Sequence, residues 1–505
     1  MRKRGQIVRV PFIILGLGAI ACAIVLMVLP SRACQPPKNV VLLVADALRP
    51  DHLGCYGYTR MIDGRPQSLT PNLDKLADEG TLFENCMSQS NWTRTSVASL
   101  LYSVNPTVRT NYHSFDYLQK STPRYCLLSA LPKTSLGPDY DRACVQTNAN
   151  LIGTVFTSLF DIVMNTVPHP FRESPYQAKG SDVMHADAGA VNRCSMDIID
   201  AASRKGRSVI LYAHYMEVHE PYRQRPEYKS LFGDKTVAGQ DWQTLREEAP
   251  VHYAESGGTG AYDPEFSDRL QRLTNDYDAC LMYLDSRIGE LVDYIDRRLG
   301  RQNTMIIVAA DHAQELGEHG NVGHGQDMYD EQIHVPLIIA GAVMPAGVRV
   351  RSFVRNIDIM PTVCDYLEFY PKCDGESLQG VAEAAASYQP TPDREVFACS
   401  DYMTGFNEDR KISMLISESR VKYILTQDRA GKAVSQELYD LKADPRERHN
   451  VIDDLSQHAD SLRAKVEAMY LEAAPQETAD LRPPSARKAP PPAVKSRLRD
   501  LGYLN

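Results

Sequence analysis

Two aspartates in this sequence directly follow apolar runs, at positions where their carboxylates are suited to binding a metal ion. Asp46 follows the run NVVLLVA, and Asp311, with His312 beside it, follows MIIVAA. Such runs are typical of strands buried on both faces of a parallel sheet. Because these sheets bind ligands at the carboxyl ends of their strands, we expect the two carboxylates to converge across the 265 positions between 46 and 311. Carboxylate and imidazole together suit zinc, manganese or a related divalent ion.

Two segments that contain histidine add further candidate ligands. The glycine-punctuated segment DHAQELGEHGNVGHG also supplies His319 and His324. Its concentration of imidazoles and carboxylates favours metal binding over an ordinary polar loop, and His319 is the member that we most expect to have a structural role. The segment HYMEVHEPY supplies His219 as a proton donor or a ligand of a second ion, with Glu217 two residues away.

The stretch FENCMSQSNWTRTSVASLLYS supplies a candidate nucleophile. Thr93 lies just ahead of a helical pattern over residues 95–101, where free backbone N–H groups and the helix dipole favour an anionic group. A threonine hydroxyl is a poor nucleophile at neutral pH, so it needs a metal ion to activate it. Ser90, with Arg94 four residues later, is the alternative hydroxyl.

The elements that must position these residues alternate between strands and helices. A long pattern of apolar residues spaced by three and four predicts a helix over residues 269–299. The alternation predicts an α/β fold with a doubly wound, mainly parallel central sheet flanked by helices. The predicted core strands cover residues 39–44, 143–147, 208–214, 305–310 and 335–340.

The pattern of apolar and polar residues changes after about residue 390. Short alternating segments there predict a small antiparallel sheet, followed by a helix over residues 453–471. The last residues are rich in proline and alanine and are expected to form an extended or disordered tail. We therefore divide the chain into residues 1–33, a membrane anchor or signal segment; 38–390, a catalytic domain; 391–473, the small sheet and helix; and 474–505, the tail.

The N-terminus predicts export from the cytoplasm. Basic residues precede an apolar run over residues 10–30, which is close to the ~20 residues of a helix that spans a bilayer. With the positive charges inside, everything that follows is outside the cytoplasm. We expect an uncleaved anchor; a cleaved signal peptide ending near Ala33 is the alternative. The net charge of -9 argues against nucleic acid as a partner.

Several motifs together resemble the sulfatase-like branch of the alkaline phosphatase superfamily. They follow the family's order from about residue 39 to residue 451, and they include VVLLVADALRPDHLGCYGY, WTRTSVASLL, HVPLIIAG and ELYDLKADPRERHNV beside the two histidine segments. The resemblance implies that Asp46, Asp311 and His312 are metal ligands. It also implies that His219 and His324 belong to the substrate site.

The resemblance leaves two registers for the nucleophile. Ser90 fits the sulfatase motif at its arginine but has tryptophan where proline belongs. Thr93 keeps the family's spacing of ten from Phe83 and aligns the helix that follows, so we favour Thr93. Threonine cannot be converted to the formylglycine of sulfatases. Relatives in this superfamily with a threonine nucleophile act on phosphate esters.

We therefore predict a metal-dependent, extracytoplasmic hydrolase or transferase that cleaves phosphate esters through a phosphothreonine at Thr93. One or two ions are expected, with zinc or manganese favoured. Calcium is the weaker choice because Ala47 replaces the second aspartate of the family's pair. The expected substrate is an anionic ester, with lipid-linked and glycan-linked esters both compatible. The alternatives are a sulfatase acting on a sulfated glycan or lipid, and a catalytically inactive, membrane-tethered binding protein.

Overall fold

A computed structural model describes residues 38–106, 140–148, 151, 156, 159–165, 187–223, 225–232, 241–370, 373–401, 410–428 and 430–471, all within one compact unit. The predicted membrane anchor over residues 10–30 and the predicted tail over residues 474–505 lie outside these residues. None of the helices in the described ranges is long and apolar enough to cross a membrane.

The described residues form an eight-stranded central sheet, which confirms the predicted α/β fold. Strand β11 runs antiparallel to both of its neighbours, β4 and β8, while the other paired strands of the sheet are parallel. The sheet is therefore mainly parallel, as predicted. In spatial order its strands are β12 (Val348–Arg355), β4 (Gly80–Met87), β11 (His334–Ala340), β8 (Thr304–Ala309), β1 (Asn39–Ala45), β7 (Ser208–Tyr215), β5 (Tyr140–Gln146) and β6 (Ile162–Asn165).

Strand β1 lies at the centre of the sheet because its apolar residues are suited to burial on both faces. All seven of its residues are buried, and it pairs with β7 on one side and β8 on the other. Val44 is level with His214 of β7 and with Ala309 of β8. The carboxyl ends of three neighbouring strands therefore lie side by side.

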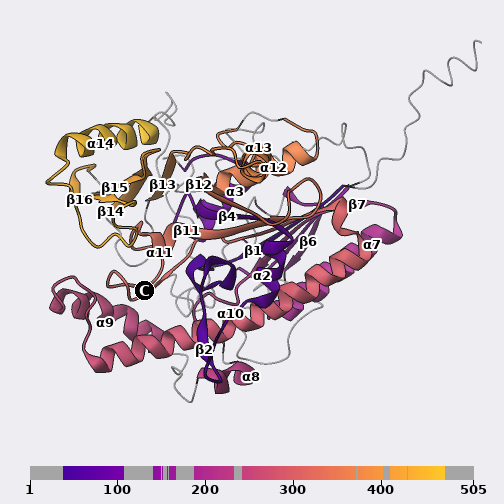
Figure 1. Ribbon diagram of the computed structural model, residues 1–505, viewed down its shortest axis with the longest axis horizontal. Coiled ribbons are helices and arrows are strands. Elements are labelled where there is room, and N and C mark those ends of the chain that lie inside the picture. Colours follow the sequence, from indigo (N-terminus) through magenta and orange to yellow (C-terminus); the bar gives the residue numbers. More distant parts are fainter. Residues whose placement is uncertain are drawn as a thin grey trace, which may run out of the picture. The chain divides into compact units, whose positions relative to one another are not determined.

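Helices cover both faces of the central sheet (Figure 1). The helices α2 (Pro71–Asp78), α7 (Ala188–Arg204) and α10 (Pro264–Arg298) pack together on one face. The helices α3 (Thr93–Tyr102), α12 (Ile359–Tyr366) and α13 (Gln379–Ala386) lie on the other. Helix α10 is the helix that the sequence predicts from residue 269. It starts earlier, at Pro264, because the Asp263 carboxylate accepts hydrogen bonds from the backbone N–H groups of Glu265 and Phe266.

The connection from β8 to β11, residues 310–333, leaves and rejoins the same edge of the sheet because the two strands are antiparallel. It contains the short strands β9 (Glu315–Leu316) and β10 (Val322–Gly323) and the helix α11 (Asp330–Ile333). The strands β4 and β12 were not predicted. β12 is an edge strand whose exposed residues include arginines at positions 349 and 351.

The C-terminal residues form the predicted small antiparallel sheet. Its strands are β13 (Val396–Asp401), β14 (Arg410–Ile416), β15 (Val421–Asp428) and β16 (Ala433–Asp440). One face of this sheet packs on helix α14 (Ser456–Leu471), which begins three residues later than predicted. The other face shares a buried cluster with Met87 of β4 and Phe353 of β12. The small sheet is thus packed on the end of the sheet that carries β4 and β12.

Candidate active site

Asp46, Asp311 and His312 meet at the carboxyl edge of the central sheet. Asp46 directly follows β1, and Asp311 lies two residues past the end of its parallel neighbour β8. One ligand atom from each side chain lies within 4.8 Å of the other two, and all three residues are 0% exposed. His312 Nε2 is 3.4 Å from Asp46 Oδ1 and 3.7 Å from Asp311 Oδ2. The convergence expected from the strand ends is present.

The chemistry of this group fits a divalent cation. Asp46 Oδ1 and Asp311 Oδ2 are buried and have no hydrogen-bond partner. His312 Nδ1 is 3.0 Å from the backbone carbonyl of Ala313, which can only accept a hydrogen bond. We therefore assign the proton to Nδ1, so that Nε2 presents its lone pair to the two carboxylates. A buried imidazole lone pair beside two carboxylates suits zinc or manganese.

The two carboxylates differ in how readily they ionise. Burial opposes ionisation of Asp46, but the neighbouring histidines, chiefly His219 and His214, outweigh it and hold the pKa of Asp46 well below its ordinary value. Burial, together with the negative charge of Asp46, raises the pKa of Asp311. A positive ion between the two carboxylates would favour the ionised form of both.

Thr93 brings its hydroxyl to this group from the first residue of α3. Thr93 Oγ1 lies 3.3 Å from Asp46 Oδ2 and 3.3 Å from His312 Nε2, and the residue is 0% exposed. The backbone is extended at Trp92 and becomes helical at Thr93, two residues earlier than the sequence predicts. The hydroxyl therefore lies at the start of a helix, where the helix dipole favours negative charge.

Ser90, the alternative hydroxyl, has different surroundings. Its Oγ is buried and has no hydrogen-bond partner. Within the described part of the chain, no hydrogen bond joins Ser90 to Asp46, Asp311 or His312. Thr93 is thus the one of these two hydroxyls that contacts the candidate metal ligands.

Two residues of this site were missed by sequence reasoning. His214 Nε2 lies 3.0 Å from Asp46 Oδ2, and its Nδ1 is 2.8 Å from the hydroxyl of Tyr212. The Asn148 amide donates to Asp46 Oδ2 at 2.7 Å and to Thr93 Oγ1 at 3.4 Å. Both residues lie at or just past the carboxyl end of a predicted strand, so the argument that selected Asp46 also applied to them.

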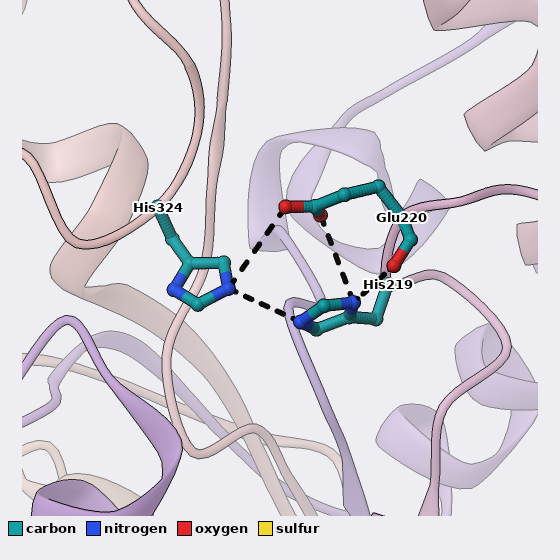
Figure 2. A group of neighbouring side chains, drawn as sticks. All are labelled: His219, Glu220 and His324. Carbon is teal, nitrogen blue, oxygen red and sulfur yellow. Dashed lines mark hydrogen bonds and ion pairs between the residues drawn. The ribbon is translucent and has the colours of Figure 1, made fainter. Parts of the chain in front are cut away.

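A second buried group, His219, Glu220 and His324, adjoins the first. Figure 2 shows one ring nitrogen of His219 pointing toward one of His324, with the carboxylate of Glu220 beside both rings. Their Nε2 atoms are 3.1 Å apart, and Glu220 Oε1 is 3.9 Å from His324 Nε2. The ring centroids of His324 and His312 are 4.1 Å apart, so the two groups share one site.

The ring orientations in the second group leave room for one positive charge between the two Nε2 atoms. Nδ1 of His219 is 2.5 Å from the carbonyl of Glu220, and Nδ1 of His324 is 3.2 Å from the carbonyl of Asn91. Because carbonyls only accept, we place a proton on each Nδ1, so two Nε2 lone pairs meet unless a proton or a cation lies between them.

The surroundings favour a proton on His219. Burial lowers the pKa of His219, but the charges of Glu220, Asp46 and Asp311 and the hydrogen bond to the Glu220 carbonyl together outweigh it, and the net shift is upward. Burial and the neighbouring histidines lower the pKa of His324 well below its ordinary value. Arg246 adds a positive charge 3.7 Å from Glu220 Oε1. His219 is therefore the proton donor of the pair and His324 the acceptor.

The structure corrects the prediction that placed Glu217 beside His219 and His324. The carboxylate of Glu217 is bound by the guanidinium of Arg225 and by the backbone N–H of Ala188, at 3.1 Å. Glu220 takes the expected place, with Oε2 3.8 Å from His219 Nδ1 and Oε1 3.9 Å from His324 Nε2. His319, which was expected to have a structural role, belongs to neither group.

Carboxylates, histidines and a hydroxyl at the carboxyl edge of an α/β sheet form the arrangement of a metal-dependent ester hydrolase. The chain belongs to the sulfatase family. That family, described as Sulfatase, matches residues 38–369, and the family N-sulphoglucosamine sulphohydrolase, C-terminal, matches residues 317–473. It is thus a hydrolase of a class whose members act on sulfate or phosphate esters and generally use a divalent metal.

Similar curated proteins include an alkaline phosphatase superfamily member and a sulfatase. The multifunctional alkaline phosphatase superfamily protein PehA of Trinickia caryophylli is 24% identical over 488 residues, which cover 83% of this chain and 91% of PehA. The uncharacterized sulfatase YidJ of Escherichia coli strain K12 is 24% identical over 444 residues, which cover 83% of each chain.

Solved structures share the fold of this chain. One protein, solved in complex with its substrate D-glucosamine-2-N,6-O-disulfate, has a TM-score of 0.62 at 18% identity and covers 88% of this chain and 100% of its own. The phosphonate monoester hydrolase of Agrobacterium radiobacter has a TM-score of 0.59 at 20% identity, with 86% and 96% covered. The fold is therefore shared by enzymes named for sulfated and for phosphorus-containing substrates.

Proposed function

We propose that this protein is a phosphate-ester hydrolase or transferase that works outside the cytoplasm and uses Thr93 as its nucleophile. The observation that carries the proposal is the position of Thr93 Oγ1, 3.3 Å from both Asp46 and His312. This side chain is a threonine, so it cannot become formylglycine, and the hydroxyl itself is available to attack the ester. Export follows from the basic and apolar N-terminal sequence, and an anionic ester linked to a lipid or glycan is the expected substrate class.

Asp46, Asp311 and His312, together with the Thr93 oxygen, would hold a zinc or manganese ion. When bound, such an ion lowers the proton affinity of the Thr93 hydroxyl and neutralises charge on the ester. Asp46 Oδ2, which accepts the hydrogen bond of the Thr93 hydroxyl at 3.3 Å, is the acceptor that takes the hydroxyl proton, because the Nε2 lone pair of His312 would be used to hold the ion. Asn148 donates to both Asp46 and Thr93, so it fixes the direction of the attacking oxygen.

The chemistry proceeds in two displacements at phosphorus. Thr93 Oγ1 forms a bond to phosphorus as the bond to the leaving alcohol breaks, and the Nε2 proton of His219 passes to the leaving oxygen. Water or an acceptor alcohol then displaces Thr93 from the phosphothreonine and gives its proton to the deprotonated His219, while Asp46 returns the hydroxyl proton to Thr93. His324, buried and neutral, accepts a hydrogen bond from His219 and so holds this proton in the site until the leaving oxygen takes it.

Kinetics of Thr93 variants test the proposal. We expect Thr93→Ala to lower kcat/KM for a bis(p-nitrophenyl) phosphate diester by at least ~10³-fold, because the nucleophile and its metal contact are both lost. Thr93→Ser keeps a hydroxyl and is expected to retain more activity. Rapid acid quench followed by mass spectrometry is expected to find phosphate on the Thr93 peptide of the wild type.

Ser90→Ala is the matched control, since it removes a nearby buried hydroxyl that has no partner in the site. Near wild-type turnover of both the phosphodiester and p-nitrophenyl sulfate by Thr93→Ala would show that the nucleophile lies elsewhere. Formylglycine at position 90, with preference for the sulfate ester, would instead identify a sulfatase.

A further inference from the structure

A third buried group of titratable side chains lies in the connection between β8 and β11, outside the candidate active site. It consists of Glu315 in β9, His319 in the loop that follows and Glu331 in α11, and we call it the β9 cluster. One ligand atom from each of the three side chains lies within 4.8 Å of the other two. The mechanism above uses none of these residues.

Glu315 is the member with unsatisfied polar atoms. It is 0% exposed, and no N–H group or hydroxyl donates to either of its carboxylate oxygens, which lie against the carboxyl group of Asp327. Within the described ranges no lysine or arginine forms an ion pair with it. Arg49 and Lys422, the cations at the ends of this region, pair with Glu318 at 2.6 Å and with Glu447 at 2.7 Å. An ionised Glu315 therefore requires a positive charge that these side chains do not supply.

His319 directs its second nitrogen into the same space. Its Nε2 is 3.3 Å from the backbone carbonyl of Glu447, and a carbonyl only accepts, so Nε2 carries a proton. Its Nδ1 then faces Glu331 Oε2 at 3.2 Å, and the ring stacks on Tyr329 with centroids 3.9 Å apart. Histidine ligands of metal ions are oriented in the same way, by a hydrogen bond from the other ring N–H to a carbonyl.

Protons are one way to satisfy the β9 cluster. Burial, with the charges of Asp327 and Glu331, raises the pKa of Glu315 well above its ordinary value. Burial lowers the pKa of His319, but the hydrogen bond and the charge of Glu331 act against it, and the net shift of this pKa is upward. In that state Glu315 and His319 each hold one extra proton. A divalent cation brings the same charge as two protons and gives all three side chains a ligand bond.

We propose that the β9 cluster is a zinc or manganese site separate from the catalytic one, with Glu315, His319 and Glu331 as its ligands. An ion equidistant from three atoms 4.8 Å apart lies about 2.8 Å from each, against about 2.1 Å in bound sites, so movements of under about 1 Å complete it. The site is accessible from two sides, because His319 lines one surface pocket and Glu331 lines another.

An ion in the β9 cluster has a structural consequence for catalysis. The cluster lies within the connection that carries His312 at its start and His324 in its middle. Bonds from one ion to β9, to the His319 loop and to α11 fix the path of the chain between those two histidines. The ion therefore acts by positioning and takes no part in the reaction.

Metal content of the full chain tests the proposal. The protein is stripped with a chelator, reloaded with Mn²⁺ or Zn²⁺ and measured by elemental analysis and by thermal unfolding. We expect Glu315→Gln to bind one ion fewer per chain than the wild type and to lose part of the rise in Tm on reloading. Glu437→Gln is the matched control, because the Glu437 carboxylate accepts hydrogen bonds from Tyr329 and Tyr439 and should keep full metal content.

An Asp46→Asn/Asp311→Asn background separates this site from the catalytic one. This variant is expected to retain an ion that is lost when Glu315→Gln is added, whatever the reaction proves to be. Glu315→Leu repeats the test with an apolar side chain if the amide variant folds poorly. Equal metal content in Glu315→Gln and wild type would overturn the proposal, and so would a rise in stability without loss of metal, because the cluster would then be held by protons alone.

Discussion

Replacing His219 by asparagine separates proton donation from binding. The Nε2 proton of His219 lies between its own Nε2 and the Nε2 of His324, which are 3.1 Å apart, and the Nδ1 side is fixed by the carbonyl of Glu220. Asparagine keeps a short N–H donor near that carbonyl but removes the Nε2 proton. General acid catalysis contributes ~10²–10⁴-fold, which corresponds to about 3–5 kcal/mol of transition-state stabilisation.

That loss should depend on the leaving group. An alkyl phosphodiester needs a proton on its departing oxygen, so we expect its kcat/KM to fall by the full ~10²–10⁴-fold in His219→Asn. A p-nitrophenyl diester leaves as a stable anion, and its kcat/KM is expected to fall by less than ~10-fold. The assay is steady-state kinetics with a matched pair of substrates, and His449→Asn is the control because the side chain of His449 is 83% exposed.

The pH profile gives a second reading of the same change. Because the pKa of His219 is raised in the folded protein, its acid form persists above the ordinary range of histidine and is lost as pH rises through the raised value. Turnover of the alkyl diester by the wild type should therefore fall as pH rises through the pKa of His219. The His219→Asn variant should show no such fall. If both substrates lose the same factor at every pH, His219 binds substrate and donates no proton.

Three further changes have defined outcomes. Asp311→Asn is expected to lose bound metal by elemental analysis, since it removes one of two buried carboxylates; unchanged metal content would remove Asp311 from the ligand set. Asp278→Asn should lower the free energy of unfolding by about 2–3 kcal/mol, because the buried Asp278 carboxylate accepts from Tyr58 and Arg60 and lies 2.7 Å from His52 Nδ1; a urea midpoint equal to that of the wild type would contradict this. Gly323→Ala should reduce turnover and Tm together, because Gly323 has φ +91° and the new Cβ would lie 2.9 Å from the carboxylate of Glu220. An active and equally stable variant would show that the backbone at Gly323 is free to adjust.

The sequence located the residues whose position depends on one strand only. Asp46 and Asp311 follow long apolar runs, and the ends of such runs can be read without knowing the neighbouring strands. His214 also ends a predicted strand, but its contact with Asp46 depends on the register that sets it level with Val44. The contact of Asn148 with Asp46 likewise depends on the strand order, in which β7 lies between β5 and β1.

The error at Glu217 has a tertiary cause. Glu217 and Glu220 both flank His219, and sequence distance gives no way to choose between them. The choice is made by Arg225 and by the N-terminus of α7, which bind the carboxylate of Glu217 and remove it from the site. The direction of β11 also escaped prediction, because an apolar run of this kind has the same composition in a parallel and an antiparallel strand.

The central position of β1 determines when the candidate metal ligands can come together. β1 is the first strand of the described chain, yet its neighbours β7 and β8 are completed only at Tyr215 and Ala309. During synthesis Asp46 is therefore made long before Asp311 and His312, which appear only when well over half of the chain is complete. Contacts of such high sequence separation form slowly and leave apolar strands unpaired in the meantime. We expect metal to bind only after β1 has paired with β7 and β8, so metal uptake would mark a late step of folding. Removing the metal with a chelator should then chiefly raise the rate of unfolding.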